Sequence, residues 1–164
     1  MMKLMIATVA SIVVSLLVVG KAEAGQYNIN ATSCVADSAT IAGGLYHGGS
    51  GKVDFTPGKT GVIVLYCPVP YNLGFSPAWM SMLYADTSTT DYVKLMWIKM
   101  NVNTGAIGTD AQIFNTNSSG SVVAQGVGIG TSYLPASYAY WVRVDLSRAT
   151  LATNPTLYMV HVEG

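Results

Sequence analysis

The strongest constraint on the fold is the lack of helical periodicity after residue 24. From there on, short apolar or alternating runs are separated by clusters of Gly, Pro, Asn, Asp and Ser. Such runs are typical of strands in an all-β domain. The predicted strands cover residues 40–46, 52–55, 61–67, 80–85, 92–102, 111–114, 121–129, 138–146 and 156–162. About eight or nine strands in one domain favour a two-sheet antiparallel sandwich of the jelly-roll kind.

The first 24 residues have the three parts of a secretory signal. A basic start ends at Lys3, an apolar run covers residues 4–20, and Ala22 and Ala24 are the small residues that a signal peptidase reads. The alternative is a retained membrane anchor, for which the apolar run is short, because a span needs about 20 residues. We therefore predict that residues 1–24 are a cleaved signal peptide and that residues 25–164 form a single β-sandwich domain. This domain would be secreted, periplasmic or on the cell surface, and would meet a membrane only through the signal before cleavage.

The chain has two cysteines, Cys34 and Cys67. In an oxidising compartment these are expected to form a disulfide. The bridge would join the polar N-terminal stretch to the apolar run over residues 61–67. Neither cysteine has a histidine or another cysteine at metal-ligand spacing, so we expect a structural role and no metal.

Charge is sparse and balanced along the chain. Charged residues make up 10% of the sequence, against about 25% in a typical soluble domain. The eight basic and eight acidic side chains cancel. This balance argues against nucleic acid and anionic membrane surfaces as partners.

Residues for catalysis are few. The only histidines are His47, in a glycine-rich segment, and His161, in the last predicted strand, and no Gly-x-Ser-x-Gly elbow occurs. Nucleophilic catalysis needs a hydroxyl or thiol beside a base that a third group orients. The sequence offers no local arrangement of that kind, so we assign no catalytic residue and no cofactor.

Two carboxylates, Asp86 and Asp91, bracket a turn rich in Ser and Thr. Turn formation explains them, because Asp side chains accept hydrogen bonds from nearby backbone. A calcium site built from both carboxylates and backbone carbonyls is the alternative, although no defined calcium motif is present.

Alternating glycines occur at Gly126, Gly128 and Gly130. The spacing does not match a nucleotide-binding loop, and no predicted helix follows. On a strand, this pattern predicts close backbone approach or an aromatic ring lying over the bare glycines.

Aromatic residues are the most suggestive candidates for a binding site. Exposed Trp and Tyr rings stack on sugars, because the negative ring face attracts polarised C–H groups. Trp141 lies on the polar face of its predicted strand with Arg143 and Asp145, which makes it the best candidate for such a platform, followed by Trp97 and Tyr84. The alternative is that Trp141 covers a core edge or lies under a loop.

The predicted strand over residues 92–102 is apolar on both faces. It is therefore either covered on both sides within the domain or in contact with something outside it, such as another copy of the chain.

Several stretches are similar to small exported bacterial proteins of unknown role. These are residues 34–38 (CVADS), 51–58 (GKVDFTPG), 61–69 (GVIVLYCPV) and 138–148 (YAYWVRVDLSR). The resemblance implies export and a β fold, and no particular chemistry.

The chain also resembles subunits of chaperone-assembled fimbriae, in its export signal, its length, its few charges and its one expected disulfide near the N-terminus. That resemblance implies donation of residues 25–31 to the next subunit, with Tyr27 and Ile29 alternating along the donated strand.

We predict a secreted, non-enzymatic β-sandwich protein that acts by surface contact, either structurally or by binding a carbohydrate or another cell-surface ligand. One alternative is a fimbria-like or coat subunit that polymerises by strand addition. The other is a secreted hydrolase of unidentified chemistry.

The secreted protein is expected to have the intact mass of residues 25–164 less two hydrogens, because export removes the signal and oxidises both thiols. Mass spectrometry of the purified protein checks this. A chain that keeps residues 1–24, or that carries two free thiols, would contradict it.

Overall fold

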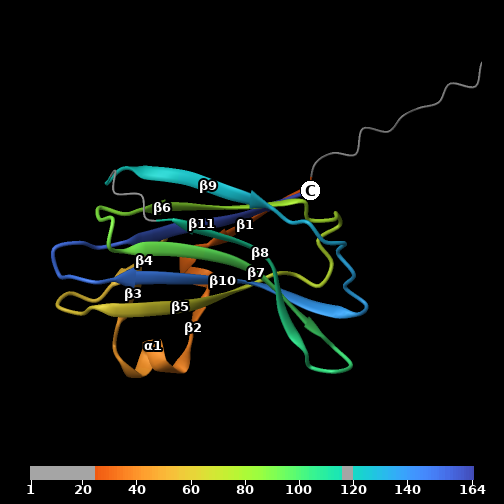
Figure 1. The fold of residues 1–164 in the computed structure, drawn as a ribbon, viewed down its shortest axis with the longest axis horizontal. Coiled ribbons are helices and arrows are strands. Elements are labelled where there is room, and N and C mark those ends of the chain that lie inside the picture. Colours follow the sequence, from red (N-terminus) through yellow and green to blue (C-terminus); the bar gives the residue numbers. More distant parts are fainter. Residues whose placement is uncertain (1–24, 116–119) are drawn as a thin grey trace, which may run out of the picture.

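The computed structural model is a sandwich of two antiparallel sheets (Figure 1), which confirms the predicted fold class. It describes residues 25–115 and 120–164, so the predicted signal lies outside the described residues. In this part of the chain, no helix is long and apolar enough to cross a membrane. The six-stranded sheet contains β1 (Gln26–Asn30), β3 (Tyr46–Gly49), β4 (Lys52–Phe55), β6 (Trp79–Ala85), β9 (Val122–Gly128) and β11 (Thr156–Glu163). The five-stranded sheet contains β2 (Val35–Ala36), β5 (Gly61–Pro68), β7 (Tyr92–Asn101), β8 (Ile107–Asn115) and β10 (Tyr138–Arg148).

The strand order is that of a jelly roll. One sheet has the order β4-β11-β6-β9 and the other has β5-β10-β7-β8, with β3 and β2 added at their respective edges. Two Greek keys wound across two sheets produce this arrangement. The chain crosses between sheets at almost every connection, so both ends of the sandwich are built from crossing loops.

The prediction of a strand over residues 40–46 is wrong. This segment instead contains α1 (Ser38–Ala42), which follows a 3-10 turn at Ala31–Ser33 and the short strand β2. The side chain of Asp37 accepts a hydrogen bond from the Thr40 backbone N–H at 2.6 Å, which satisfies one of the free N–H groups at the helix start. That cap also lowers the pKa of the Asp37 carboxyl through its hydrogen bonds with Thr40.

The remaining predicted strands are present with small differences at their ends. The largest difference is in β8, which begins at Ile107, four residues before the predicted start at Ala111. The predicted turn over residues 47–51 is shorter, because Tyr46–Gly49 forms β3 and only Ser50 and Gly51 turn the chain.

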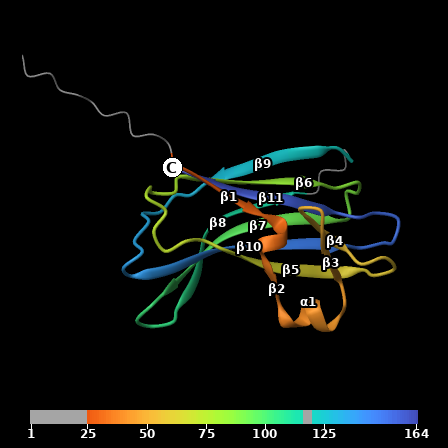
Figure 2. The same ribbon diagram turned by 180° about the vertical axis from the view of Figure 1, so that it is seen from behind.

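The N-terminal strand β1 pairs with β11 of its own domain (Figure 2). Tyr27 lies opposite Val162, and the buried Ile29 lies opposite Val160. The segment that strand donation would require is therefore already part of the chain's own sheet. Its transfer to another subunit would cost the pairing with β11.

The core lies between the sheets, and the disulfide is buried at its edge. Cys34 and Cys67 are bonded, as predicted, and the bond ties the 3-10 turn before β2 to β5. In the register of the five-stranded sheet, Cys67 lies next to Val142, and Val142 lies next to Trp97. The opposite sheet contributes Met80 and other buried side chains of β6.

The alternating glycines of β9 lie beneath an indole ring. Trp79 of β6 pairs with Gly128, and a Cβ at Gly126 would overlap the indole Nε1 and the Met80 carbonyl oxygen. The predicted close approach with an aromatic ring over bare glycines is therefore confirmed for Gly126 and Gly128, whereas Gly130 lies beyond the end of β9 with open space around it. Trp79 lies on the outer face of the six-stranded sheet and remains 41% exposed.

Replacing both Cys34 and Cys67 with serine should lower the free energy of unfolding by about 3–4 kcal/mol, because the bridge restricts the unfolded chain over 33 residues of separation. Denaturant titration of the oxidised wild type against the double variant checks this. A loss below about 1 kcal/mol would show that the bridge contributes little to the fold.

Candidate functional site: a groove on the outer face of the five-stranded sheet

Strand β10 has one face in the core and one face outside. Val142, Val144 and Leu146 are fully buried between the sheets. The alternate residues of β10 therefore point away from the core, because successive side chains of a strand lie on opposite faces. This places Trp141, Arg143 and Asp145 on the outer face, as their spacing predicted.

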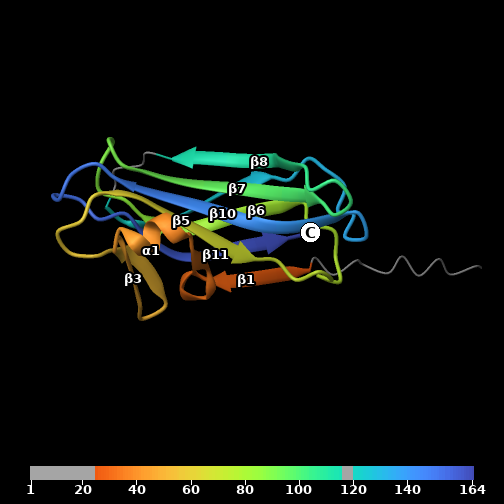
Figure 3. The same ribbon diagram turned by 90° about the horizontal axis from the view of Figure 1, so that it is seen from below.

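The register brings neighbours from three other strands beside these residues. Trp141 lies opposite Pro68 of β5 on one side and Ile98 of β7 on the other. Arg143 lies opposite Tyr66 of β5 and Met96 of β7. On the next strand, Thr109 of β8 lies opposite Ile98 and Ile107 lies opposite Met100. The four strands lie side by side in Figure 3.

These side chains form a groove with a cavity of about 230 Å³. Met96 and Ile98 are each 6% exposed and form an apolar floor. The lining is Tyr66, Met96, Ile98, Ile107, Thr109, Trp141 and Arg143. The outer apolar face of β7 is thus covered largely by side chains of the neighbouring strands. Of the two alternatives for this doubly apolar strand, coverage within the domain therefore applies.

Arg143 is fixed in the groove by Asp145. Its Nε donates to Asp145 Oδ1 at 2.7 Å and its Nη2 donates to Asp145 Oδ2 at 3.1 Å. The hydrogen bond to Asp145 raises the pKa of Arg143, so the guanidinium is always charged. Nη1 makes no hydrogen bond within the part of the chain that the structure describes, which leaves its two N–H groups for a ligand.

Three of the five predicted binding residues do not line this groove. Asp145 lies beside it and holds Arg143, whereas Trp97 and Tyr84 are buried in the core. Trp97 is 1% exposed and Tyr84 is fully buried, with its hydroxyl donating to Gln125 Oε1 at 3.0 Å. Neither ring has a face open to a ligand, so the prediction is wrong for both. Both lie on the inward face of their strands, which alternation alone could not decide where both faces are apolar.

Five residues of the groove were not predicted as binding residues from the sequence: Tyr66, Met96, Ile98, Ile107 and Thr109. Tyr66 is 38% exposed between the buried Leu65 and Cys67. Its alternation with these two residues could have indicated from the sequence that Tyr66 points away from the core. Ile107 and Thr109 lay outside the predicted strand, and only the β7–β8 pairing brings them to the groove.

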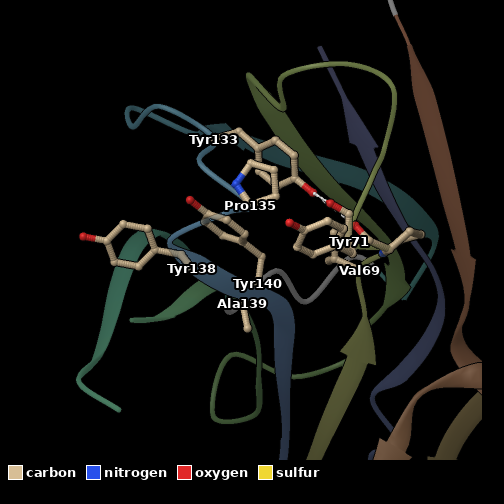
Figure 4. A pocket seen from close by; sticks show the side chains of 8 residues that line it. Val69, Tyr71, Tyr133, Pro135, Tyr138, Ala139 and Tyr140 are labelled. Atoms are coloured by element: carbon tan, nitrogen blue, oxygen red, sulfur yellow. Dashed lines mark hydrogen bonds between the residues drawn. The ribbon is translucent and has the colours of Figure 1, made fainter. Parts of the chain in front are cut away.

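A second hollow lies at the end of the sandwich where β10 begins (Figure 4). The tyrosine rings that line it also hold the loops in place. The Tyr133 hydroxyl donates to the Tyr71 carbonyl oxygen at 2.8 Å, and the Leu134 N–H donates to the Tyr140 hydroxyl at 2.9 Å. Its cavity of about 110 Å³ is smaller than that of the groove.

The histidines lie apart from both hollows. His47 Nδ1 is 3.1 Å from Asp54 Oδ1, and His161 Nε2 is 3.3 Å from Glu163 Oε2. The other ring nitrogen of His161 contacts the Asn28 amide oxygen. Within the described residues, these contacts include no serine or threonine hydroxyl, so they do not assemble a catalytic triad.

No family model matches the sequence, and no curated protein matches it either. Among solved structures, the chain is similar to a mutant of the carbohydrate-binding module CBM29-2 in complex with cellulohexaose, at 12% identity and a TM-score of 0.46, over 85% of this chain and 91% of that one. The module CBM29_1 from Piromyces equi matches at 9% identity and a TM-score of 0.42, over 87% and 92%. A family two carbohydrate esterase from Cellvibrio japonicus matches at 11% and 0.41, over 86% of this chain and 34% of that one. Likeness at this level establishes neither a family nor a ligand.

Replacing Trp97 of β7 and replacing Trp141 of β10 should have very different effects on the free energy of unfolding. Trp97→Ala should lower the free energy of unfolding by about 3–5 kcal/mol, because it empties a core site. Trp141→Ala should cost about 1 kcal/mol or less, because its ring lies on the outer face. Urea titrations of both variants check this, and equal losses would contradict the assignment of Trp141 to the surface.

Proposed function

We propose that this chain is an exported, non-enzymatic protein that binds a neutral carbohydrate in the groove of the five-stranded sheet. The observation that supports this most is the pairing of two accessible aromatic rings, Trp141 and Tyr66, on adjacent strands around the fixed Arg143. The disulfide fits an oxidising compartment.

The apolar part of the groove suits the C–H face of a sugar ring. Trp and Tyr offer large faces whose negative charge attracts polarised C–H groups. Trp141 and Tyr66 occupy diagonal positions on the adjacent strands β10 and β5. Diagonal residues in an antiparallel pair are about 7–8 Å apart. The buried Met96 and Ile98 beneath them exclude water from that face.

The polar part of the groove suits sugar hydroxyls. The free Nη1 of Arg143 can donate to a hydroxyl oxygen, and the Thr109 hydroxyl can both donate and accept. Because Asp145 neutralises Arg143, the site has no excess positive charge for a polyanion. This favours a neutral glycan over a sulfated or uronate-rich one.

Trp141→Ala and Arg143→Ala should each weaken binding by about tenfold or more, since each removes a contact of about 1.4 kcal/mol. The measurement is affinity electrophoresis against cellulose derivatives, xylan, mannan, chitin derivatives and starch, followed by calorimetry with oligosaccharides of the glycan that retards the protein.

Trp79→Ala is the matched control, because Trp79 is exposed on the opposite sheet and lies outside the groove. It should bind as the wild type does. Retardation by none of the glycans, or an equal loss in the Trp79 and Trp141 variants, would overturn the proposal.

A further inference from the structure

Two carboxylates are buried at the end of the sandwich opposite the tyrosine-lined hollow. Asp86 follows the last residue of β6, and Asp91 precedes the first residue of β7. The connection between them crosses from one sheet to the other. Asp86 is 1% exposed and Asp91 is fully buried.

Hydrogen bonds satisfy both carboxylate oxygens of Asp91 but only one of Asp86. Asp91 accepts from the Ala149 N–H at 2.8 Å and from the Thr153 hydroxyl. Asp86 Oδ1 accepts from the Ser88 N–H at 3.1 Å. Asp86 Oδ2 is buried and has no hydrogen-bond partner among the described residues.

No positive side chain of the described residues forms an ion pair with either acid. The nearby Arg148 donates instead to the carbonyl oxygens of Thr150, Leu151 and Lys59. A buried carboxylate without a cation is costly, because burial removes its hydration. Burial raises the pKa of the Asp86 carboxyl, and the charge of Asp91 raises it further.

We propose that Asp86 and Asp91 bind one Ca²⁺ ion at this end of the sandwich. Ca²⁺ accepts six to eight oxygen ligands in a flexible geometry, and two carboxylates balance its charge. No cluster of three or more His, Cys, Asp or Glu side chains that could hold a metal occurs in the described ranges. Backbone carbonyls, hydroxyls and water therefore supply the other ligands.

The ion would join two connections of the jelly roll. Asp86 and Asp91 belong to the β6–β7 connection, and Asp91 also holds Ala149 and Thr153 of the β10–β11 connection. Two carboxylates with neutral oxygens predict the weak affinity of extracellular modules, with a Kd of about 10⁻⁴–10⁻³ M. The role is structural and independent of the groove, so it stands whether or not the groove binds a glycan.

Thermal unfolding of the full secreted protein tests the site. In 10 mM CaCl2, Tm should rise by about 4 °C or more over its value in EGTA, because the ion binds only the folded chain. Mg²⁺ at the same concentration should have a smaller effect, since it requires near-ideal octahedral ligands. Equilibrium dialysis with radioactive calcium should find one ion per chain.

Asp86→Asn should abolish both the Tm shift and the bound calcium, and Asp86→Ser serves as a second variant if the first does not fold. Asp54→Asn is the matched control, because Asp54 is also buried but pairs with Lys52 and His47. It should keep the full calcium response. Equal Tm values in calcium and EGTA with no ion bound, or an unchanged response in the Asp86 variants, would overturn the proposal.

Discussion

The in-register pairing of β10 between β5 and β7 is the interaction on which the rest of the structure depends. It sets Val142 between Cys67 and Trp97 on the inner face, and Arg143 between Tyr66 and Met96 on the outer face. A slip of one residue would exchange the two faces and expose the core side of the strand. The same pairing thus buries the hydrophobic core and assembles the groove, so fold and candidate site share one origin.

The periphery of the sandwich is held by a few specific contacts. The disulfide fixes the N-terminal segment to β5, and β1 pairs with β11 beyond the end of β4. At one end, tyrosine hydroxyls tie the loops to the backbone. At the other, the carboxylate of Asp91 holds the β10–β11 connection. Crossing loops need such ties, because a jelly roll places almost every connection at its two ends.

Much of the fold could be predicted from period-two patterns and turn residues, and the disulfide from the two cysteines. The segment at residues 40–46 could not, because its helix begins at a side-chain cap from Asp37 that the apolar pattern of residues 40–46 does not contain. The site was predicted in part. The alternation in β10 predicted that Trp141 and Arg143 lie on the outer face. The burial of Trp97 and Tyr84 could not be predicted, because it depends on how the two sheets pack. The contribution of Ile107 and Thr109 to the groove depends on the strand order, which no local sequence pattern contains.

The most direct test of the groove uses the chain's three tryptophans as probes. Each indole N–H gives its own resonance in a proton–nitrogen NMR spectrum, and single substitutions assign the three signals. On titration with the oligosaccharide that binds, we expect the Trp141 signal to shift while the signals of Trp79, on the opposite sheet, and Trp97, in the core, stay in place. A shift of Trp79 with Trp141 unmoved would contradict the account.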